Sequence, residues 1–337
     1  MSQSATSLMS SPSASVISTT KTVPAYRQMA TGIDLHMGIA AAFITICIWA
    51  SWLISVKMGT SSVLTTFDLA LMRYGVPGLV LLPFLCRAWP EVIKVPKRLL
   101  AGIVVGAGLP FLFLSSAGMH YAPVAHAGLL IPGTFPLFVT AIAVLIYKET
   151  LTKQRLLGLS TIGLGILVLV SFSLLQGQAD VWKGDLYFLG ASLCWAVFTI
   201  CLRVAGLPPL AATAILGLLS TFILGLLFVL GLVESGLAEV SLPTLAWQFV
   251  VQALLVGLFT GFSYGFAINR IGAESTAAIG SLTPVIATLA AIPLLGEPLT
   301  LAASIGIVMI CFGVFCASGV TLPSRKLASR KACTAKA

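Results

Sequence analysis

The chain alternates long apolar stretches with short polar connections. Ten stretches of about 20 residues are built almost entirely of apolar side chains, and Pro, Gly or charged residues separate them. A membrane-spanning helix needs about 20 predominantly apolar residues, so this pattern predicts ten such helices. The predicted spans are residues 36–57, 66–87, 99–119, 125–147, 154–175, 183–204, 210–233, 246–268, 273–295 and 298–320.

The composition agrees with this pattern. Hydrophobic residues make up 58% of the chain and charged residues 9%, and the mean hydropathy is +1.06. A soluble globular domain is about 25% charged. We therefore expect an all-α integral membrane protein in which the lipid bilayer is the main partner.

The second half of the chain repeats the first. Six residues recur 148 positions later. They are Pro136, Glu149, Leu151, Thr152, Gly158 and Gly165, matched by Pro284, Glu297, Leu299, Thr300, Gly306 and Gly313. Trp49 and Ala50 recur as Trp195 and Ala196 at an offset of 146. The repeat is too long for a solenoid unit, and duplicated bundles of membrane helices are what many transporters are built from.

Five predicted spans fall in each half, so the second copy must enter the membrane from the opposite side. Lys and Arg are enriched in short cytoplasmic loops. With residue 1 in the cytoplasm, sixteen Lys and Arg lie on the inner side, whereas only Lys57 and Lys183 lie outside and Arg73 lies within a span. The sequence therefore predicts ten transmembrane helices as two inverted five-helix repeats, with both termini in the cytoplasm.

Four segments follow from this organisation. Residues 1–35 are expected to form a disordered cytoplasmic tail, because they are rich in Ser, Thr and Ala and lack the apolar core of a signal peptide. Residues 36–175 and 182–320 are the two repeats. Residues 321–337 form a basic cytoplasmic tail that we expect to lie against anionic lipid headgroups.

Catalytic and cofactor motifs are missing from the sequence. It contains no HExxH, GxSxG or Walker motif and no cysteine pair with metal-ligand spacing. We therefore predict no enzyme, no metal and no cofactor. The net charge of +9 is spread over loops without aromatic interleaving, so no nucleic-acid partner is expected.

The histidines and the acidic residues lie at the ends of the predicted spans or in loops. His120 and His126 fall near the outer surface, where water is expected to satisfy them, and no carboxylate marks the bilayer centre. Proton and sodium pumps usually place an ionisable group in the ion path. The pattern favours a facilitator or exchanger, unless an end-of-helix group such as Glu274 or His126 carries a proton.

Glycines and prolines mark the interior helices. Small residues allow close helix packing, so Gly102 and Gly106 in the third span, and Gly257, Gly261 and Gly265 in the eighth, are expected in the tight interior.

Prolines within spans leave backbone carbonyls without their usual partners. They are Pro132, Pro136, Pro284 and Pro293. Nearby hydroxyl groups are expected to donate to some of these carbonyls, and a bound substrate is the alternative donor for the others. The hydroxyls belong to Thr134, Thr140, Thr283 and Thr288.

Two groups of polar-tipped side chains lie deep in spans. Trp49 and Trp195 occupy matched positions away from the interface, and either line a cavity or pack in the core. Arg73 either snorkels toward Asp68 at the outer end of its helix, or faces a central cavity and binds an anionic group of a substrate, with Tyr74 and the two tryptophans nearby.

These features together resemble the EamA-type drug/metabolite transporter superfamily over residues 36–320. The resemblance rests on the Trp-Ala pairs at 49–50 and 195–196, on Arg73-Tyr74, and on the runs from Pro136 to Glu149 and from Pro284 to Glu297. It implies ten helices in inverted repeats around a central cavity, and usually export of small metabolites, amino acids or drugs. One departure is Lys148, where the second copy has the more usual Gly296. The end of the fourth helix is therefore expected to differ.

The predicted function is secondary transport of a small organic molecule, by export or exchange, through alternating access in the inner or plasma membrane. The candidate substrate-binding residues are Trp49, Arg73, Tyr74, Thr134, Pro136, Trp195, Thr283 and Pro284. Two alternatives stay open: an intramembrane enzyme, which would need clustered catalytic acids or histidines, and a non-transporting membrane scaffold, which would need a folded soluble domain or an extended tail.

Overall fold

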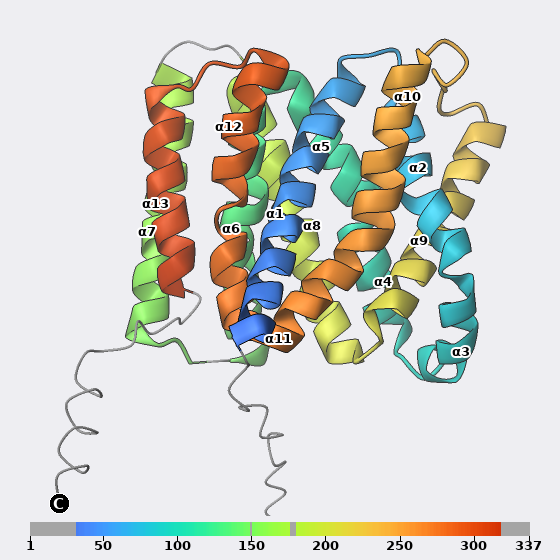
Figure 1. The fold of residues 1–337 in the computed structure, drawn as a ribbon, viewed down its shortest axis with the longest axis horizontal. Coiled ribbons are helices and arrows are strands. Elements are labelled where there is room, and N and C mark those ends of the chain that lie inside the picture. Colours follow the sequence, from blue (N-terminus) through green and yellow to red (C-terminus); the bar gives the residue numbers. More distant parts are fainter. Residues whose placement is uncertain (1–31, 149, 176–179, 318–337) are drawn as a thin grey trace, which may run out of the picture.

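The computed structural model describes residues 32–148, 150–175 and 180–317, and every regular element within them is a helix. The helices pack side by side into one bundle (Figure 1). In chain order they are α1 (Gly32–Thr60), α2 (Thr66–Val80), α3 (Leu82–Val92), α4 (Lys97–Ala107), α5 (Leu109–Tyr121), α6 (Val124–Tyr147), α7 (Lys153–Leu175), α8 (Val181–Ala205), α9 (Pro209–Val229), α10 (Leu242–Gln248), the π-helix η1 (Phe249–Phe259), α11 (Thr260–Gly280), α12 (Thr283–Leu295) and α13 (Leu301–Ala317). Both predicted tails lie outside the described residues, apart from the first turn of α1, which begins before residue 36.

Eight stretches of these helices are long and apolar enough to cross a membrane. They are Ile33–Thr60, Lys97–Tyr121, Val124–Ile146, Lys153–Phe172, Val181–Ala205, Pro209–Val229, Leu242–Gly272 and Ser275–Leu295. The pair α2 and α3 passes the same test only as one broken span, and α13 is apolar but shorter. The chain is thus an all-helical protein with multiple apolar spans.

The second predicted span, residues 66–87, is not one straight helix. α2 and α3 meet at Leu81 with a bend of 76°. Pro83 in the first turn of α3 has no N–H to donate to the preceding turn. A smaller interruption at Gly108 divides α4 from α5, with Pro110 just beyond it, although the two helices still form one span. These breaks place irregular backbone inside the bundle, and one of them shapes the site described below.

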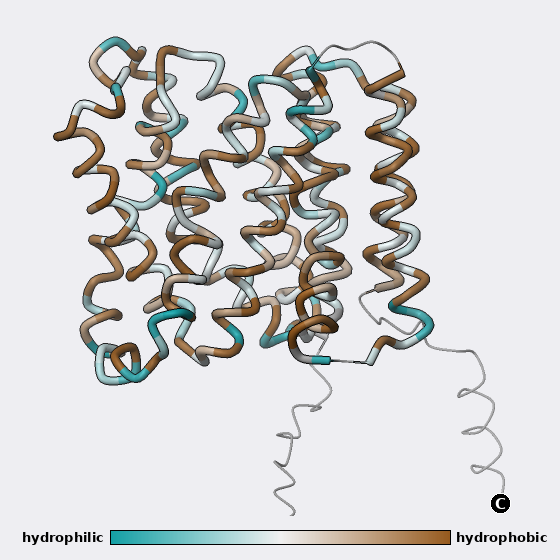
Figure 2. The backbone as a smooth tube through the Cα atoms, turned by 180° about the vertical axis from the view of Figure 1, so that it is seen from behind, coloured by the Kyte–Doolittle hydropathy of each residue, from teal (hydrophilic) through white to brown (hydrophobic). Residues whose placement is uncertain are grey.

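The bundle has two polar ends. Most hydrophilic segments lie at its top and bottom, and apolar residues dominate between them (Figure 2). α1 begins and α13 ends at the bottom in Figure 1, called the lower end here; the opposite end is the upper end. α1 runs toward the upper end and α8 runs away from it (Figure 1).

The predicted interior glycines fall into two groups. A Cβ built on Gly102, Gly106 or Gly257 would lie within 2.6 Å of a neighbouring helix, so the prediction of close packing is confirmed for these three. It is wrong for Gly265, which has nothing within 4 Å, and for exposed Gly261. These two glycines lie beyond the π-helix, where α11 no longer packs closely on α2.

The expected difference at the end of the fourth helix is wrong. Lys148 adopts the left-handed conformation with φ 54°, and its repeat partner Gly296 adopts the same conformation with φ 67°. Both residues end a helix, a role for which glycine is preferred because it carries no Cβ. The backbone of this helix end is thus kept although the side chain differs.

Candidate functional site

A guanidinium group is buried inside the bundle. Arg73 projects from α2 and is only 9% exposed. Its Cζ lies 5.0 Å from the ring centre of Trp52, and 5.8 Å from those of Tyr74 and Phe111. A cation within about 6 Å of an aromatic face is attracted to it. These rings therefore hold the arginine in place without neutralising it.

The rings around Arg73 belong to a continuous aromatic cluster. Trp52 of α1 stacks on Phe111 of α5 at 5.4 Å, and Phe111 contacts Trp195 of α8 at 5.0 Å. We call Arg73, Trp52, Phe111 and Trp195 the aromatic site. It joins three helices of the first half to the first helix of the second half. Of the candidate residues, Arg73 and Trp195 are thus brought together through Phe111.

Two polar atoms of the aromatic site lack partners. Nη1 of Arg73 and Nε1 of Trp52 are buried and have no hydrogen-bond partner in the described part of the chain. Among these residues no carboxylate forms an ion pair with Arg73. A buried, unpaired donor costs about 1–3 kcal/mol, and more when charged. The site therefore has free capacity for an acceptor.

The snorkelling interpretation of Arg73 is not what the structure shows. Asp68, the carboxylate in the first turn of α2, is fully buried and already engaged in hydrogen bonds. It accepts hydrogen bonds from the amides of Thr65 and Gly236, at 2.8 and 2.9 Å, and from the hydroxyl of Ser235 at 2.6 Å. Asp68 thus fixes the loop after α9 to the start of α2, and Arg73 stays under its rings.

Tyr74 has a different role from its neighbour. Its hydroxyl lies 2.9 Å from the carbonyl oxygen of Ala107 and 2.8 Å from that of Gly108, and can donate to either. These carbonyls flank the break between α4 and α5. Tyr74 thus stabilises the irregular backbone that precedes Phe111, and positions that ring against Arg73.

The other candidate residues lie elsewhere in the interior. Trp49 contacts Tyr264 of α11 at 5.4 Å instead of joining the aromatic site. The Thr134 hydroxyl donates to Ser192 of α8 at 2.8 Å. Pro136 is half-buried in α6.

Thr283 and Pro284 fit the expected relation between proline and hydroxyl. Pro284 has no amide to donate to the carbonyl of Gly280, and the Thr283 hydroxyl donates to that carbonyl at 2.7 Å. Pro284 itself packs close to Gly128 of α6. The hydroxyl therefore satisfies this carbonyl within the chain, without a substrate.

Sequence reasoning missed a buried amide cluster. Gln248 and Gln252 lie one turn apart across the start of the π-helix, and both are fully buried. Ser55 of α1 donates to Oε1 of Gln248 at 2.5 Å and accepts from Nε2 of Gln252 at 3.3 Å. Oε1 of Gln252 has no partner among the described residues. Two glutamines four residues apart in an apolar span were a usable signal.

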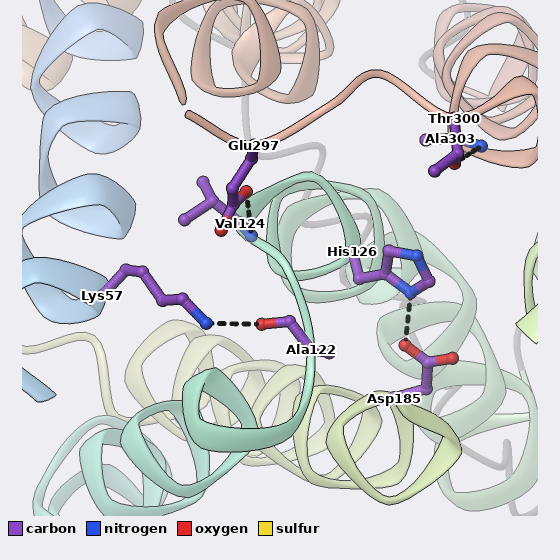
Figure 3. A network of polar contacts seen from close by, with 8 residues as sticks. All are labelled: Lys57, Ala122, Val124, His126, Asp185, Glu297, Thr300 and Ala303. Carbon is purple, nitrogen blue, oxygen red and sulfur yellow. Dashed lines mark hydrogen bonds and ion pairs between the residues drawn. The ribbon is translucent and has the colours of Figure 1, made fainter. Parts of the chain in front are cut away.

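A second polar group, the upper-end cluster, consists of Lys57, His126, Asp185 and Glu297 (Figure 3). His126 is only 4% exposed, and its Nδ1 lies 2.7 Å from Oδ1 of Asp185. The expectation that water satisfies His126 is therefore wrong, because the turn that precedes α6 lies against the start of α8. Asp185 itself is almost fully buried rather than exposed at a span end.

Glu297 and Lys57 hold the same turn from two sides. Oε2 of Glu297 accepts the Val124 amide at 2.8 Å, and Nζ of Lys57 donates to the carbonyls of Met119 and Ala122 at 2.5 and 3.2 Å. Burial raises the pKa of Glu297 above its usual value, although the Val124 hydrogen bond and the charges of Lys57 and His126 oppose the rise.

Comparison with known proteins places the chain in a family. The sequence profile of the EamA-like transporter family matches residues 36–171 and again residues 182–319. The chain therefore belongs to the EamA-like transporter family, and it is a multi-pass membrane protein of a transporter class.

Two individual proteins are similar to this chain. The "Uncharacterized transporter YyaM" of Bacillus subtilis (strain 168) is 28% identical over 270 residues, which cover 74% of this chain and 84% of the relative. A solved structure described as "Crystal structure of protein" has a TM-score of 0.56 at 19% identity, covering 86% of this chain and 97% of that one. The latter supports the fold alone.

Proposed function

We propose that this protein is a secondary transporter for a small organic solute with an anionic or zwitterionic group. The observation that carries the proposal is the buried guanidinium of Arg73, whose Nη1 has no partner among the described residues. Arginine presents a planar set of donors that matches a carboxylate or phosphate. Such a group would supply the missing acceptor, and Trp52, Phe111 and Trp195 would contact the apolar part of the solute.

The solute would move by alternating access of two inverted five-helix repeats, residues 36–175 and 182–320. The opposite directions of α1 and α8 support this arrangement (Figure 1). The matched tryptophans support it as well. Trp49 contacts Tyr264 in the second half, and Trp195 contacts Phe111 in the first. In each case the first helix of one half meets the third span of the other.

The contact between α7 and α13 also supports a symmetric relation between the two halves. By sequence, Gly158 corresponds to Gly306 and Gly165 to Gly313. In space, a Cβ on Gly313 would lie 2.7 Å from the carbonyl oxygen of Gly158, and one on Gly306 would lie 3.9 Å from that of Gly165. Exchange of the halves converts one contact into the other, as a two-fold axis in the membrane plane requires.

The orientation can be tested by labelling. With both termini in the cytoplasm, we expect an impermeant maleimide to label Glu239→Cys in intact cells and to leave Lys94→Cys unlabelled until the cells are opened. Both positions are exposed in the structure, in loops at opposite ends of the bundle. A variant without native cysteines provides the background. Labelling of Lys94→Cys but not Glu239→Cys in intact cells would invert the proposed topology.

Transport can be tested with the purified protein. In liposomes loaded with a mixture of isotope-labelled amino acids and organic acids, we expect exchange of at least one solute without ATP, because the sequence carries no nucleotide-binding motif. Mass spectrometry of the external medium gives the rate, and protein-free liposomes are the control. Exchange that occurs only when ATP is supplied would refute a secondary mechanism.

A further inference from the structure

The buried amide cluster of Gln248, Gln252 and Ser55 leaves one polar atom without a partner. That atom is Oε1 of Gln252, a side chain with no exposed surface. A buried amide oxygen costs free energy unless it accepts a hydrogen bond. Since it finds no donor among the described residues, this oxygen is open to a donor that a bound molecule carries.

The hydrogen bonds of the cluster fix which end of the Gln252 amide is free. They begin at the backbone carbonyl of Ser55, which can only accept, and which takes Nε2 of Gln248 at 2.8 Å. Oε1 of Gln248 then faces the Ser55 hydroxyl, which donates to it at 2.5 Å. With its hydrogen used, Oγ of Ser55 can only accept from Gln252, and it does so from Nε2 at 3.3 Å. The free end of Gln252 is thus an acceptor and not a donor.

The free oxygen lies in the same part of the bundle as the unpartnered donors of the aromatic site. Ser55, which holds Gln252, follows Trp52 by three residues on α1, and residues three apart share a helix face. The π-helix that carries Gln252 packs on α2, since a Cβ on Gly257 would lie 3.3 Å from the carbonyl oxygen of Arg73. α1, α2 and η1 also contact one another. These three helices therefore bring one free acceptor and two free donors together.

The three unpartnered atoms have a chemical complement. They are Oε1 of Gln252, Nη1 of Arg73 and Nε1 of Trp52, and none of them satisfies another. A simple carboxylate accepts from the two donors but leaves the glutamine oxygen buried and unpaired. A solute that carries a donor beside its anionic group satisfies all three, and a site built in this way rejects the analogue that lacks the donor.

We propose that Gln252 is a specificity-determining residue, whose Oε1 selects solutes that carry an ammonium or hydroxyl donor beside the anionic group. The inference rests on the function proposed above, in which Arg73 binds the anion. An amide suits this position because it is neutral. A carboxylate would pair with the arginine and remove its free donor, whereas the amide oxygen accepts from the solute and leaves the charge of Arg73 available.

Three probes with one carbon skeleton test this selection on the wild type. Phenylpropionate carries the carboxylate alone, phenyllactate adds a hydroxyl, and phenylalanine adds an ammonium at the same carbon. Binding to the full-length protein in detergent is measured from the rise in the unfolding midpoint with probe concentration. We expect phenyllactate to bind about threefold and phenylalanine about tenfold more tightly than phenylpropionate, because hydrogen bonds from charged donors are the stronger ones. This order needs no variant.

Two variants assign the preference to the glutamine. Gln252→Met removes the amide but keeps an unbranched side chain, and should bind all three probes about as weakly as phenylpropionate. Gln154→Met makes the same change on the exposed surface of α7 and should keep the order of the wild type.

The outcomes separate this inference from the function on which it rests. Equal binding of the three probes by the wild type, or an unchanged preference in Gln252→Met, would overturn the role of Gln252 while leaving the anion site in place. A wild type that binds none of the probes, or an Arg73→Gln variant that binds all of them normally, would overturn the proposed anion site itself.

Discussion

Replacing Arg73 by glutamine is expected to lower transport of an anionic or zwitterionic solute about 10- to 100-fold while the protein remains folded and inserted. A hydrogen bond to a charged group contributes about 1.5–3 kcal/mol, and each 1.4 kcal/mol changes an equilibrium or rate constant about tenfold. Glutamine keeps an amide donor but not the charge. The measurement is the initial rate of solute exchange in liposomes of equal protein density.

Two variants separate the role of the charge from that of the fold. Arg73→Lys retains the charge without the planar set of donors, and should transport at an intermediate rate. Arg87→Gln makes the same change on the exposed surface of α3 and should behave as the wild type. If Arg73→Gln exchanged solute at the wild-type rate, the arginine would serve only to pack against the aromatic rings, and the solute would bind elsewhere.

The all-helical character and the presence of multiple apolar spans could be predicted from the sequence, because the length of an apolar stretch is a local property. An apolar stretch of about 20 residues crosses a bilayer wherever it occurs, and a matched run such as 136–152 and 284–300 needs no knowledge of packing. The break between α2 and α3 was missed for a related reason. Apolar content stays high through Leu81, and the effect of Pro83 on direction enters only with backbone geometry.

The partners of Arg73 could not be predicted in this way. Asp68 lies five residues before it, on the same helix, and one interpretation had the arginine snorkel toward it. The carboxylate instead binds Ser235 and Gly236, more than 160 residues later. Phe111 had no signal of its own, since one phenylalanine in an apolar span resembles any other. Its place depends on the Gly108 break and on the hydroxyl of Tyr74.

The upper-end cluster shows that the position of a residue within a predicted span does not determine its hydrogen-bond partner. His126 and Asp185 each lie near the end of an apolar span, and sequence reasoning assigned His126 to water. The two span ends lie against each other, so the side chains satisfy one another instead. Groups at the ends of spans are therefore candidates for contacts between the repeats, in addition to contacts with solvent.

The repeat-matched glycines of α7 and α13 give the second large prediction, because glycines that are equivalent in the sequence repeat have different surroundings in the structure. Gly158 and Gly306 occupy matched positions. A Cβ on Gly158 would lie 2.5 Å from the backbone nitrogen of Ala317, whereas one on Gly306 would meet only a Leu129 methyl group at 3.4 Å and other atoms farther away. Backbone cannot move aside as a side chain can. Gly158→Ala should therefore destabilise the protein by about 1–3 kcal/mol, the usual cost of overpacking.

Gly306→Ala should have the opposite sign. The new methyl group makes ordinary contacts, and alanine in a helix is favoured over glycine by about 0.5–1 kcal/mol. Gly163→Ala serves as a control on α7 itself, since nothing lies within 4 Å of its Cβ position. The midpoint of thermal unfolding in detergent, followed by size-exclusion chromatography, gives the order: Gly158→Ala below the wild type, and the other two at or above it. Equal losses in Gly158→Ala and Gly306→Ala would mean that the helices approach equally closely at both glycines, and that the tighter contact at Gly158 is not a feature of the folded protein.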